Sequence, residues 1–154
     1  MWQLNLPAGN IRVRKYNSQL QVFDSQRNKW VSLSPEEWVR QHFIHYLIKF
    51  KGIPSALIAV EVQIYQNGMK KRCDAILYDR HLKPLVLIEF KAPHIPITQS
   101  TIDQTAVYNN SLHVPFLIIS NGIHHLFCVI STPANQAKIL NETDFFNQIE
   151  SKLK

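Results

Sequence analysis

The sequence is poor in glycine and cysteine, and these shortages exclude several classes of protein. It has only four glycines in 154 residues, and none belongs to the G-x-x-x-x-G-K-[ST] loop that binds nucleotide phosphates. Its two cysteines, Cys73 and Cys128, lie in apolar segments, so we expect reduced core residues rather than disulfides or a zinc ribbon. His42 and His45 are three residues apart but lack a third ligand at a spacing typical of zinc sites.

Long apolar segments are also missing. No apolar run approaches the length of a membrane span, and Met1–Pro7 lacks the cationic start and apolar stretch of a signal peptide. We therefore expect a cytoplasmic protein without a membrane partner. The hydrophobic content of 45% and the length of the chain suit one domain with a proper core. The net charge of +6 favours a polyanionic partner without specifying it.

Hydrophobic patterns predict alternating strands and helices. Ser34, Pro35 and Glu37 form a capping-box pattern that predicts the start of a helix ending near Lys51. Asn67-Gly68 predicts a hairpin turn. Further helices are expected at about 98–112 and 142–153, and strands at 20–24, 29–33, 58–65, 71–78, 85–91, 116–120 and 125–130.

Charged residues interrupt two of these strands. Glu89-Phe90-Lys91 closes an apolar run that is typical of a buried strand. Asp74 lies in the apolar part of a second segment, Lys71–Tyr78, and a short polar stretch with one proline joins the two. Side chains alternate along a strand, so Glu89 and Lys91 share a face. Adjacent antiparallel strands would bring Asp74 to that same face.

Such charges need compensation. Desolvating an unpaired ion costs several kcal/mol. Two carboxylates and a lysine suit a hard divalent cation such as Mg²⁺, and the lysine could position a water nucleophile or stabilise phosphorane charge. The alternative is a structural ion pair, with Asp74 or Glu89 bridged to Lys91 or Arg72.

The D…ExK pattern of Asp74, Glu89 and Lys91 resembles the signature of the PD-(D/E)xK nucleases. Its context resembles the N-terminal nuclease domain of type I restriction enzyme R subunits, over roughly residues 20 to 130. The segments that carry this resemblance, in the family's order, are the opening helix (Ser34–Phe43), the K-R-x-D strand (Lys71–Asp74), the E-x-K-A-P strand (Ile88–Pro93) and the Q-x-x-x-Y helix shared with RecB-type nucleases (Gln104–Tyr108).

The resemblance implies an α/β fold with a restriction-endonuclease-like core, in which helices flank a mixed central β-sheet. We divide the chain into an N-terminal segment with a β-hairpin, residues 1–33, and a single nuclease-like unit, residues 34–154. It also implies a DNA endonuclease that depends on Mg²⁺ or Mn²⁺. Asp74 and Glu89 would ligate the metal, with the carbonyl of Phe90 as a third ligand, and Lys91 would orient or activate water.

A glutamate on the first helix often supports the metal in this superfamily, commonly through water. Glu37 already has a local explanation as the capping-box residue. Glu36 shares the buried stripe of Val39 and Phe43, so we favour Glu36 for the site.

Further residues are predicted to contact DNA or the catalytic lysine. Gln104 and Tyr108 lie one helical turn apart, although both could simply pack against the sheet. Basic residues near the site strands could track phosphates, or form only a solvated surface; they are Lys70, Lys71, Arg72 and Arg80.

The family's R subunits carry an ATPase motor after the nuclease domain, and this chain has no room for one. We therefore expect a free-standing relative or a detached module, with DNA and other restriction–modification subunits as partners. The alternative function is a non-catalytic DNA-binding or assembly module that keeps the fold.

Overall fold

The structure, a computed structural model, describes residues 1–107, 109–131 and 136–154. A small antiparallel sheet forms the N-terminal part, in the order β1-β2-β3. Its strands are β1 (Val13–Tyr16), β2 (Gln19–Asp24) and β3 (Lys29–Ser32). The β2–β3 hairpin confirms the predicted one. The sequence did not predict β1, because this strand is only four residues long and half of it is exposed.

Helix α1 (Pro35–Lys49) starts where the sequence predicts. Oγ of Ser34 accepts a 3.0 Å hydrogen bond from the amide of Glu37, and Pro35 occupies the first turn. The other half of the predicted capping box is not found among the described residues. The Glu37 carboxylate pairs with the half-buried Arg27 and the buried Arg40 instead, because two guanidinium groups offer it stronger partners than one amide.

The central sheet has six strands in the order β4-β5-β6-β7-β8-β9. Every neighbouring pair is antiparallel except β6 and β7, which are parallel, so the sheet is mixed. The strands are β4 (Ile58–Gln66), β5 (Met69–Tyr78), β6 (Pro84–Phe90), β7 (Phe116–Ser120), β8 (His125–Ser131) and β9 (Gln136–Leu140). A short 3₁₀ turn, η1 (Ser55–Leu57), precedes β4.

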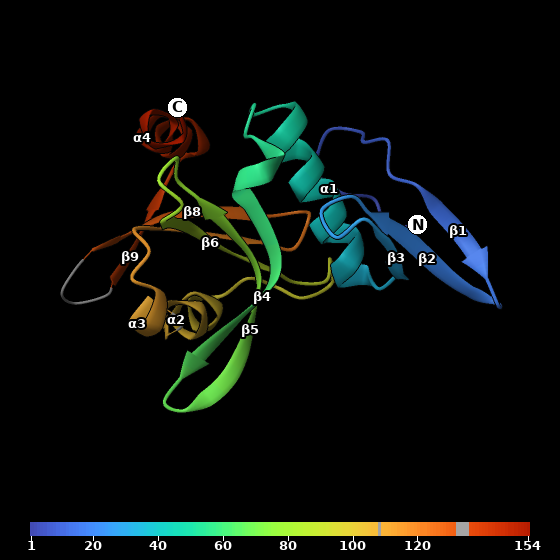
Figure 1. The fold of residues 1–154 in the computed structure, drawn as a ribbon, viewed down its shortest axis with the longest axis horizontal. Coiled ribbons are helices and arrows are strands. Elements are labelled where there is room, and N and C mark those ends of the chain that lie inside the picture. The colour runs from blue at the N-terminus through green and yellow to red at the C-terminus, as the bar shows by residue number, and fades with distance from the viewer. Residues whose placement is uncertain (108, 132–135) are drawn as a thin grey trace.

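Helices cover both faces of this sheet (Figure 1). Helices α1 and α4 (Glu142–Leu153) share one core with the strands, in which Phe43 of α1 and Phe145 of α4 are fully buried. Helix α2 (Gln99–Val107) packs on the opposite face, where its Ile102 meets Ile76 and Leu87. The fold is therefore α/β with a mixed sheet between helical layers, and it matches a restriction-endonuclease-like core.

The helix expected over 98–112 corresponds to α2 and α3 (Asn109–Leu112), which lie on either side of residue 108, itself outside the described residues. One strand differs from the prediction. Strand β9 was not predicted, because it is a short and largely exposed edge strand without an apolar run. No helix in the described ranges is long and apolar enough to cross a membrane.

Strands β4 and β5 change direction at the level of Glu61 and Asp74. Glu61 has a φ of +53°, which is costly for a residue with a side chain and interrupts the ladder between Val60 and Val62. Before this point Val60 packs into the core under α1, and beyond it Val62 packs into the core under α2. Asp74 therefore lies at the bend of a long hairpin, which protrudes beyond the sheet in Figure 1.

Candidate functional site

The pairing of β5 with β6 brings Asp74 and Glu89 together. Ala75 pairs with Ile88, so continuing this antiparallel register by one residue places Asp74 opposite Glu89. Residues directly opposite share a face, with Cβ atoms roughly 5 Å apart. Glu89 lies two residues after Leu87 on β6, so the two side chains point to the same face of the sheet. Leu87 belongs to the core under α2, so both carboxylates lie on the α2 side of the sheet. The predicted juxtaposition of these two acids is confirmed.

Glu89 is buried, with 9% of its surface exposed. Its Oε1 is fully buried and has no hydrogen-bond partner among the described residues. Burial, followed by the charge of Asp74 and a hydrogen bond with it, raises the pKa of Glu89 to about 9. The same surroundings raise the pKa of Cys73 to about 12, chiefly through burial and then through the charges of Glu89 and Asp74. The protein groups around Asp74 and Glu89 therefore do not fully neutralise the negative charge of these two carboxylates.

Asp74 is held by the backbone of the neighbouring strand. The amide of Phe90 donates a 2.7 Å hydrogen bond to its Oδ2. Lys91 follows β6, and its amide bonds the carbonyl of Ser120 at 2.8 Å, which ties the lysine to the end of β7. Among the described residues, neither carboxylate forms an ion pair with a lysine or arginine within 4.0 Å, because Arg72 pairs with Glu61 instead. The alternative of a structural ion pair is therefore not what the structure contains.

The two glutamates of the first helical turn have different surroundings. The side chain of Glu36 is exposed, yet partial burial, and then the charge of Asp74, raises its pKa, while Lys91 opposes the shift. Glu36 thus lies within electrostatic range of both site strands. Glu37 is buried, with carboxylate oxygens 2.8 Å from Arg27 and 2.6 Å from Arg40. The expectation that Glu36 shares the buried stripe of Val39 and Phe43 was wrong, because the stripe includes Glu37 instead. The role of Glu36 at the site stays a prediction, supported by its electrostatic interaction with Asp74.

Sequence reasoning missed the arginine that connects these elements. Arg40 is buried, and its Nη1 lies 2.5 Å from Oε1 of Glu61 and donates a 3.3 Å hydrogen bond to the carbonyl of Asp74. Burial pushes the pKa of Glu61 upward, but its hydrogen bond and ion pair with Arg40 hold it below the ordinary value. Two signals were available in the sequence: an arginine three residues after Glu37, and an acid within the apolar alternation of β4.

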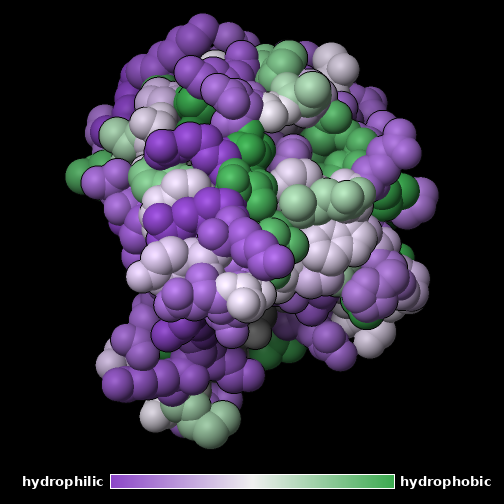
Figure 2. Space-filling view, turned by 90° about the vertical axis from the view of Figure 1, so that its right-hand side faces the viewer, coloured by the Kyte–Doolittle hydropathy of each residue, from purple (hydrophilic) through white to green (hydrophobic). Residues whose placement is uncertain are grey.

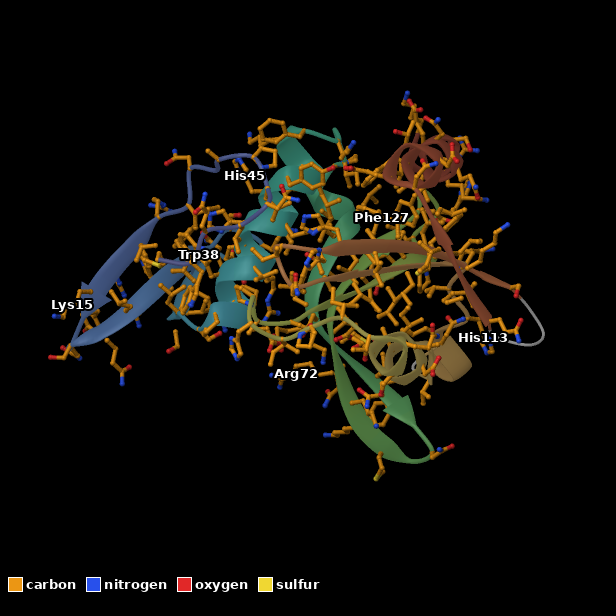
Figure 3. The ribbon with its side chains drawn as sticks, turned by 180° about the vertical axis from the view of Figure 1, so that it is seen from behind. Lys15, Trp38, His45, Arg72, His113 and Phe127 are labelled. Carbon is orange, nitrogen blue, oxygen red and sulfur yellow. The ribbon has the colours of Figure 1, made fainter. Side chains whose placement is uncertain are left out.

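The predicted DNA-contacting residues are not all at the site. Lys70, Lys71 and Arg72 lie on the protruding hairpin that leads to Asp74, and Arg72 is labelled there in Figure 3. The placement of Arg80 was wrong. It lies in the loop at the opposite end of β5 and β6, and its guanidinium donates to the carbonyl of Lys154. A hairpin loop necessarily sits a strand length away from residues at the other end of its strands.

The predicted Q-x-x-x-Y pair can be located only in part. Gln104 is exposed on α2, the helix that covers the face carrying Asp74 and Glu89. Tyr108 lies outside the described residues. The roles of both stay predictions.

The donor set fits a hard divalent cation. A buried carboxylate oxygen without a partner, beside a second carboxylate, is a site where a cation would relieve an existing energetic cost. The protein ligands would be Asp74, Glu89 and the carbonyl of Phe90. The described residues contain no cluster of three histidine, cysteine, aspartate or glutamate side chains placed to hold a metal, so water would complete the coordination.

Comparison with known protein families decides the relationship. Residues 35–143, more than half of the chain, match the family described as type I restriction enzyme R protein N terminus. The chain belongs to this family. The match starts at α1 and ends at the start of α4, so it contains the central sheet and every carboxylate of the site, while the N-terminal sheet lies outside it. No curated protein matches the chain.

The family supports a nuclease-like domain of the type I restriction enzyme R protein. Within the family's segment the fold places the D…ExK residues on adjacent strands, as the resemblance implied. The assignment of Asp74, Glu89 and Lys91 to a nuclease signature stays a prediction.

Proposed function

We propose that this chain is a metal-dependent deoxyribonuclease. The observation that carries the proposal is the buried Oε1 of Glu89, which lacks a partner beside a second carboxylate on the next strand. A protein without use for a cation here would be more stable with an amide or an apolar residue at this position. Membership of the family of type I restriction enzyme R protein N termini supports a nuclease-like domain.

Each residue of the site has a role in this proposal. Asp74 and Glu89 hold the cation, and the hydrogen bond from the Phe90 amide keeps the Asp74 carboxylate in place. Lys91 orients the attacking water or stabilises charge on the phosphate. Glu36 extends the carboxylate set from α1. When bound, Mg²⁺ or Mn²⁺ supplies Lewis-acid stabilisation of the phosphodiester and lowers the pKa of a coordinated water.

The substrate proposed is DNA, with other restriction–modification subunits as partners, because the family is that of restriction enzyme R proteins. The net charge of +6 favours a polyanion, and the basic residues at the start of β5 lie on the strand that carries Asp74. Gln104, which lies on α2, and Tyr108 would contact Lys91 or DNA.

A second candidate is a DNA-binding or assembly module that keeps the nuclease fold without cleaving. It is favoured by one observation, the lack of a preassembled three-ligand cluster among the described residues. The two candidates differ in whether the site takes up a cation.

A crystal soaked in Mn²⁺ tests the proposal. We expect anomalous density between the carboxylates of Asp74 and Glu89, and no such density in a Glu89→Gln crystal. Calorimetry should give the same contrast for Mg²⁺ in solution. Wild-type protein that binds neither ion would leave only the non-catalytic candidate.

A further inference from the structure

One face of the N-terminal sheet carries arginine, aromatic and amide side chains. Register and alternation place Arg14, Gln21 and Ser32 on this face, and Phe23 beside Trp30. The opposite face contains Val22 and Asp24, both fully buried. The sheet therefore buries one side and presents the other, and Figure 2 looks onto this part of the molecule, where hydrophilic residues interleave with paler and apolar ones.

The arginines of the presented face lie over aromatic rings. The guanidinium of Arg12 is 4.0 Å from the ring centroid of Phe23, and that of Arg14 is 4.4 Å from Trp30 and 4.8 Å from Tyr16. Phe23 and Trp30 also meet edge to face at 5.4 Å. The exposed guanidinium of Arg12 thus lies against one ring, and the half-buried guanidinium of Arg14 lies near two. Arginine planes held in this way can also stack on nucleic-acid bases.

These arginines are not neutralised by acids. Arg14 donates from Nε to the amide oxygen of Gln21 at 2.8 Å, and within the described residues neither Arg12 nor Arg14 forms an ion pair. Residues 1–33 hold five lysines and arginines against one acid, Asp24, so this segment carries +4 of the chain's +6. Asp24 is buried against Arg27, and it leaves the presented face without a negative charge.

A cavity of about 380 Å³ borders this face on the α1 side. Its lining includes Arg12, Phe23, Gln41, His45 and Lys49. Gln41 is only 5% exposed, and its Nε2 has no acceptor among the described residues. Lys15 marks the outer tip of the sheet and His45 the side of α1 that borders the cavity (Figure 3). The cations Arg12 and Lys49 suit a phosphate, and the unpaired amide donor of Gln41 suits the acceptor edge of a base.

We propose that the arginine–aromatic face of β1–β3 and the adjoining cavity bind single-stranded DNA, with bases stacked on Arg12 and Arg14 and one nucleotide held at Gln41. A single strand is favoured over a duplex, because duplex bases are stacked on one another and cannot reach these planes. The arginine–aromatic face lies outside the segment that matches the family, whereas Gln41 and the α1 side of the cavity lie within it. The inference builds on the proposed function, which makes DNA the substrate.

Fluorescence anisotropy with a labelled oligodeoxythymidine of about 15 nucleotides, in EDTA, measures this binding without cleavage. We expect wild type to bind the oligonucleotide more tightly than a duplex of equal length, with affinity that falls as salt rises. The double variant Arg12→Gln/Arg14→Gln should lose about tenfold or more in affinity. Its charge-matched control, Lys83→Gln/Lys138→Gln, removes exposed lysines elsewhere and should lose less than about threefold.

Two further variants separate stacking and base contact from structure. Arg12→Lys/Arg14→Lys keeps the charge but removes the planar groups, so affinity should fall while the salt dependence stays unchanged. Gln41→Met should weaken binding while the melting temperature stays the same or rises, because an orphaned buried donor is removed. Reduced stability with unchanged affinity would overturn the role of Gln41.

Equal losses in the two charge-matched double variants, preference for the duplex, or no binding at all would overturn the inference. Its failure is distinguishable from failure of the proposed nuclease function. A chain that binds the oligonucleotide as described but never cleaves with Mg²⁺ contradicts only the nuclease. A chain that cleaves, with affinity untouched by Arg12→Gln/Arg14→Gln, contradicts only this inference.

Discussion

The backbone amide of Phe90 donates a 2.7 Å hydrogen bond to Oδ2 of Asp74. This bond joins the acid on β5 to the strand that carries Glu89 and Lys91, so the relative positions of the three groups depend on it. Asp74 therefore has a structural role as the acceptor of this bond, in addition to its proposed role as a metal ligand. Substitutions at this position therefore differ according to whether an acceptor remains.

Asp74→Asn and Asp74→Ala should have different stabilities. Asn keeps an oxygen for the Phe90 amide and removes a like charge from Glu89, so its melting temperature in EDTA should equal or exceed that of wild type. Ala leaves the amide unpaired and should be less stable than Asn by about 1–3 kcal/mol. Thermal melts of the three proteins measure this order. Equal melting temperatures for the two variants would mean that the bond contributes nothing.

The stability of the metal-free protein should fall with rising pH because of Glu89. Its pKa is raised from 4.5 to about 9, so the folded state holds this proton more tightly than the unfolded state. That stabilisation is complete below about pH 4.5 and is lost as the pH rises through about 9. Denaturant unfolding in EDTA between about pH 5 and 9 should show the decline, and Glu89→Gln should remove most of it.

Glu150→Gln provides the control for that experiment, since Glu150 is exposed and, among the described residues, pairs with Lys154, which ends α4. It should retain the decline of wild type. Mg²⁺ should stabilise wild type more at high pH than at low pH, because the cation competes with the proton on Glu89, and it should not stabilise Glu89→Gln. A pH profile shared by all three proteins would contradict the burial of an ionisable Glu89.

Glu36 and Glu37 should give opposite phenotypes. Glu37→Gln removes the charge that faces Arg27 and Arg40 and should cost about 3 kcal/mol in unfolding free energy, more than a lost helix cap. Glu36→Gln should leave stability unchanged, because Glu36 is exposed. It should weaken Mg²⁺ binding, because the charge of Glu36 interacts with that of Asp74. Paired calorimetry and thermal melts measure both effects. If Glu37→Gln weakened Mg²⁺ binding while Glu36→Gln did not, Glu37 would be the residue at the site and our assignment of the two glutamates would be wrong.

Arg40 should be the most sensitive residue of the buried ion-pair network. Arg40→Met leaves the buried Glu37 and the half-buried Glu61 without their shared cation and should cost on the order of 3–5 kcal/mol. Arg72→Gln is the matched control, because Arg72 also pairs with Glu61 but is largely exposed, so its loss should cost no more than about 1 kcal/mol. Chemical denaturation compares the two. Similar losses would show that the network is not held by Arg40.

Periodicity predicted most of the helices and strands, the resemblance to the nuclease family implied how they assemble, and two anomalies pointed to the candidate site. Asp74 and Glu89 stood out because charges rarely interrupt apolar strands, and antiparallel pairing then fixed their common face. The link through Arg40 could not be predicted, because it joins a helix to a bend that depends on the positive φ of Glu61. Arg80 was misplaced because proximity in sequence to a site strand says nothing about which end of the strand is near.

The N-terminal sheet shows the same limit. Its hairpin was expected, but β1 was not, and without β1 the stacking of Arg12 and Arg14 on aromatic rings cannot be seen in the sequence. Cross-strand pairs depend on register, which a short and partly exposed strand specifies weakly.

Conversion of supercoiled plasmid by the full chain, with Mg²⁺ or Mn²⁺ and with EDTA, tests the nuclease assignment most directly. Lys91→Met and Asp74→Asn should be inactive while they remain folded, and Lys83→Gln should cleave as wild type does. We expect nicked and linear DNA from wild type with either cation and none with EDTA. Wild-type protein that leaves every DNA form intact in both cations, or cleavage that persists in Lys91→Met, would contradict the account.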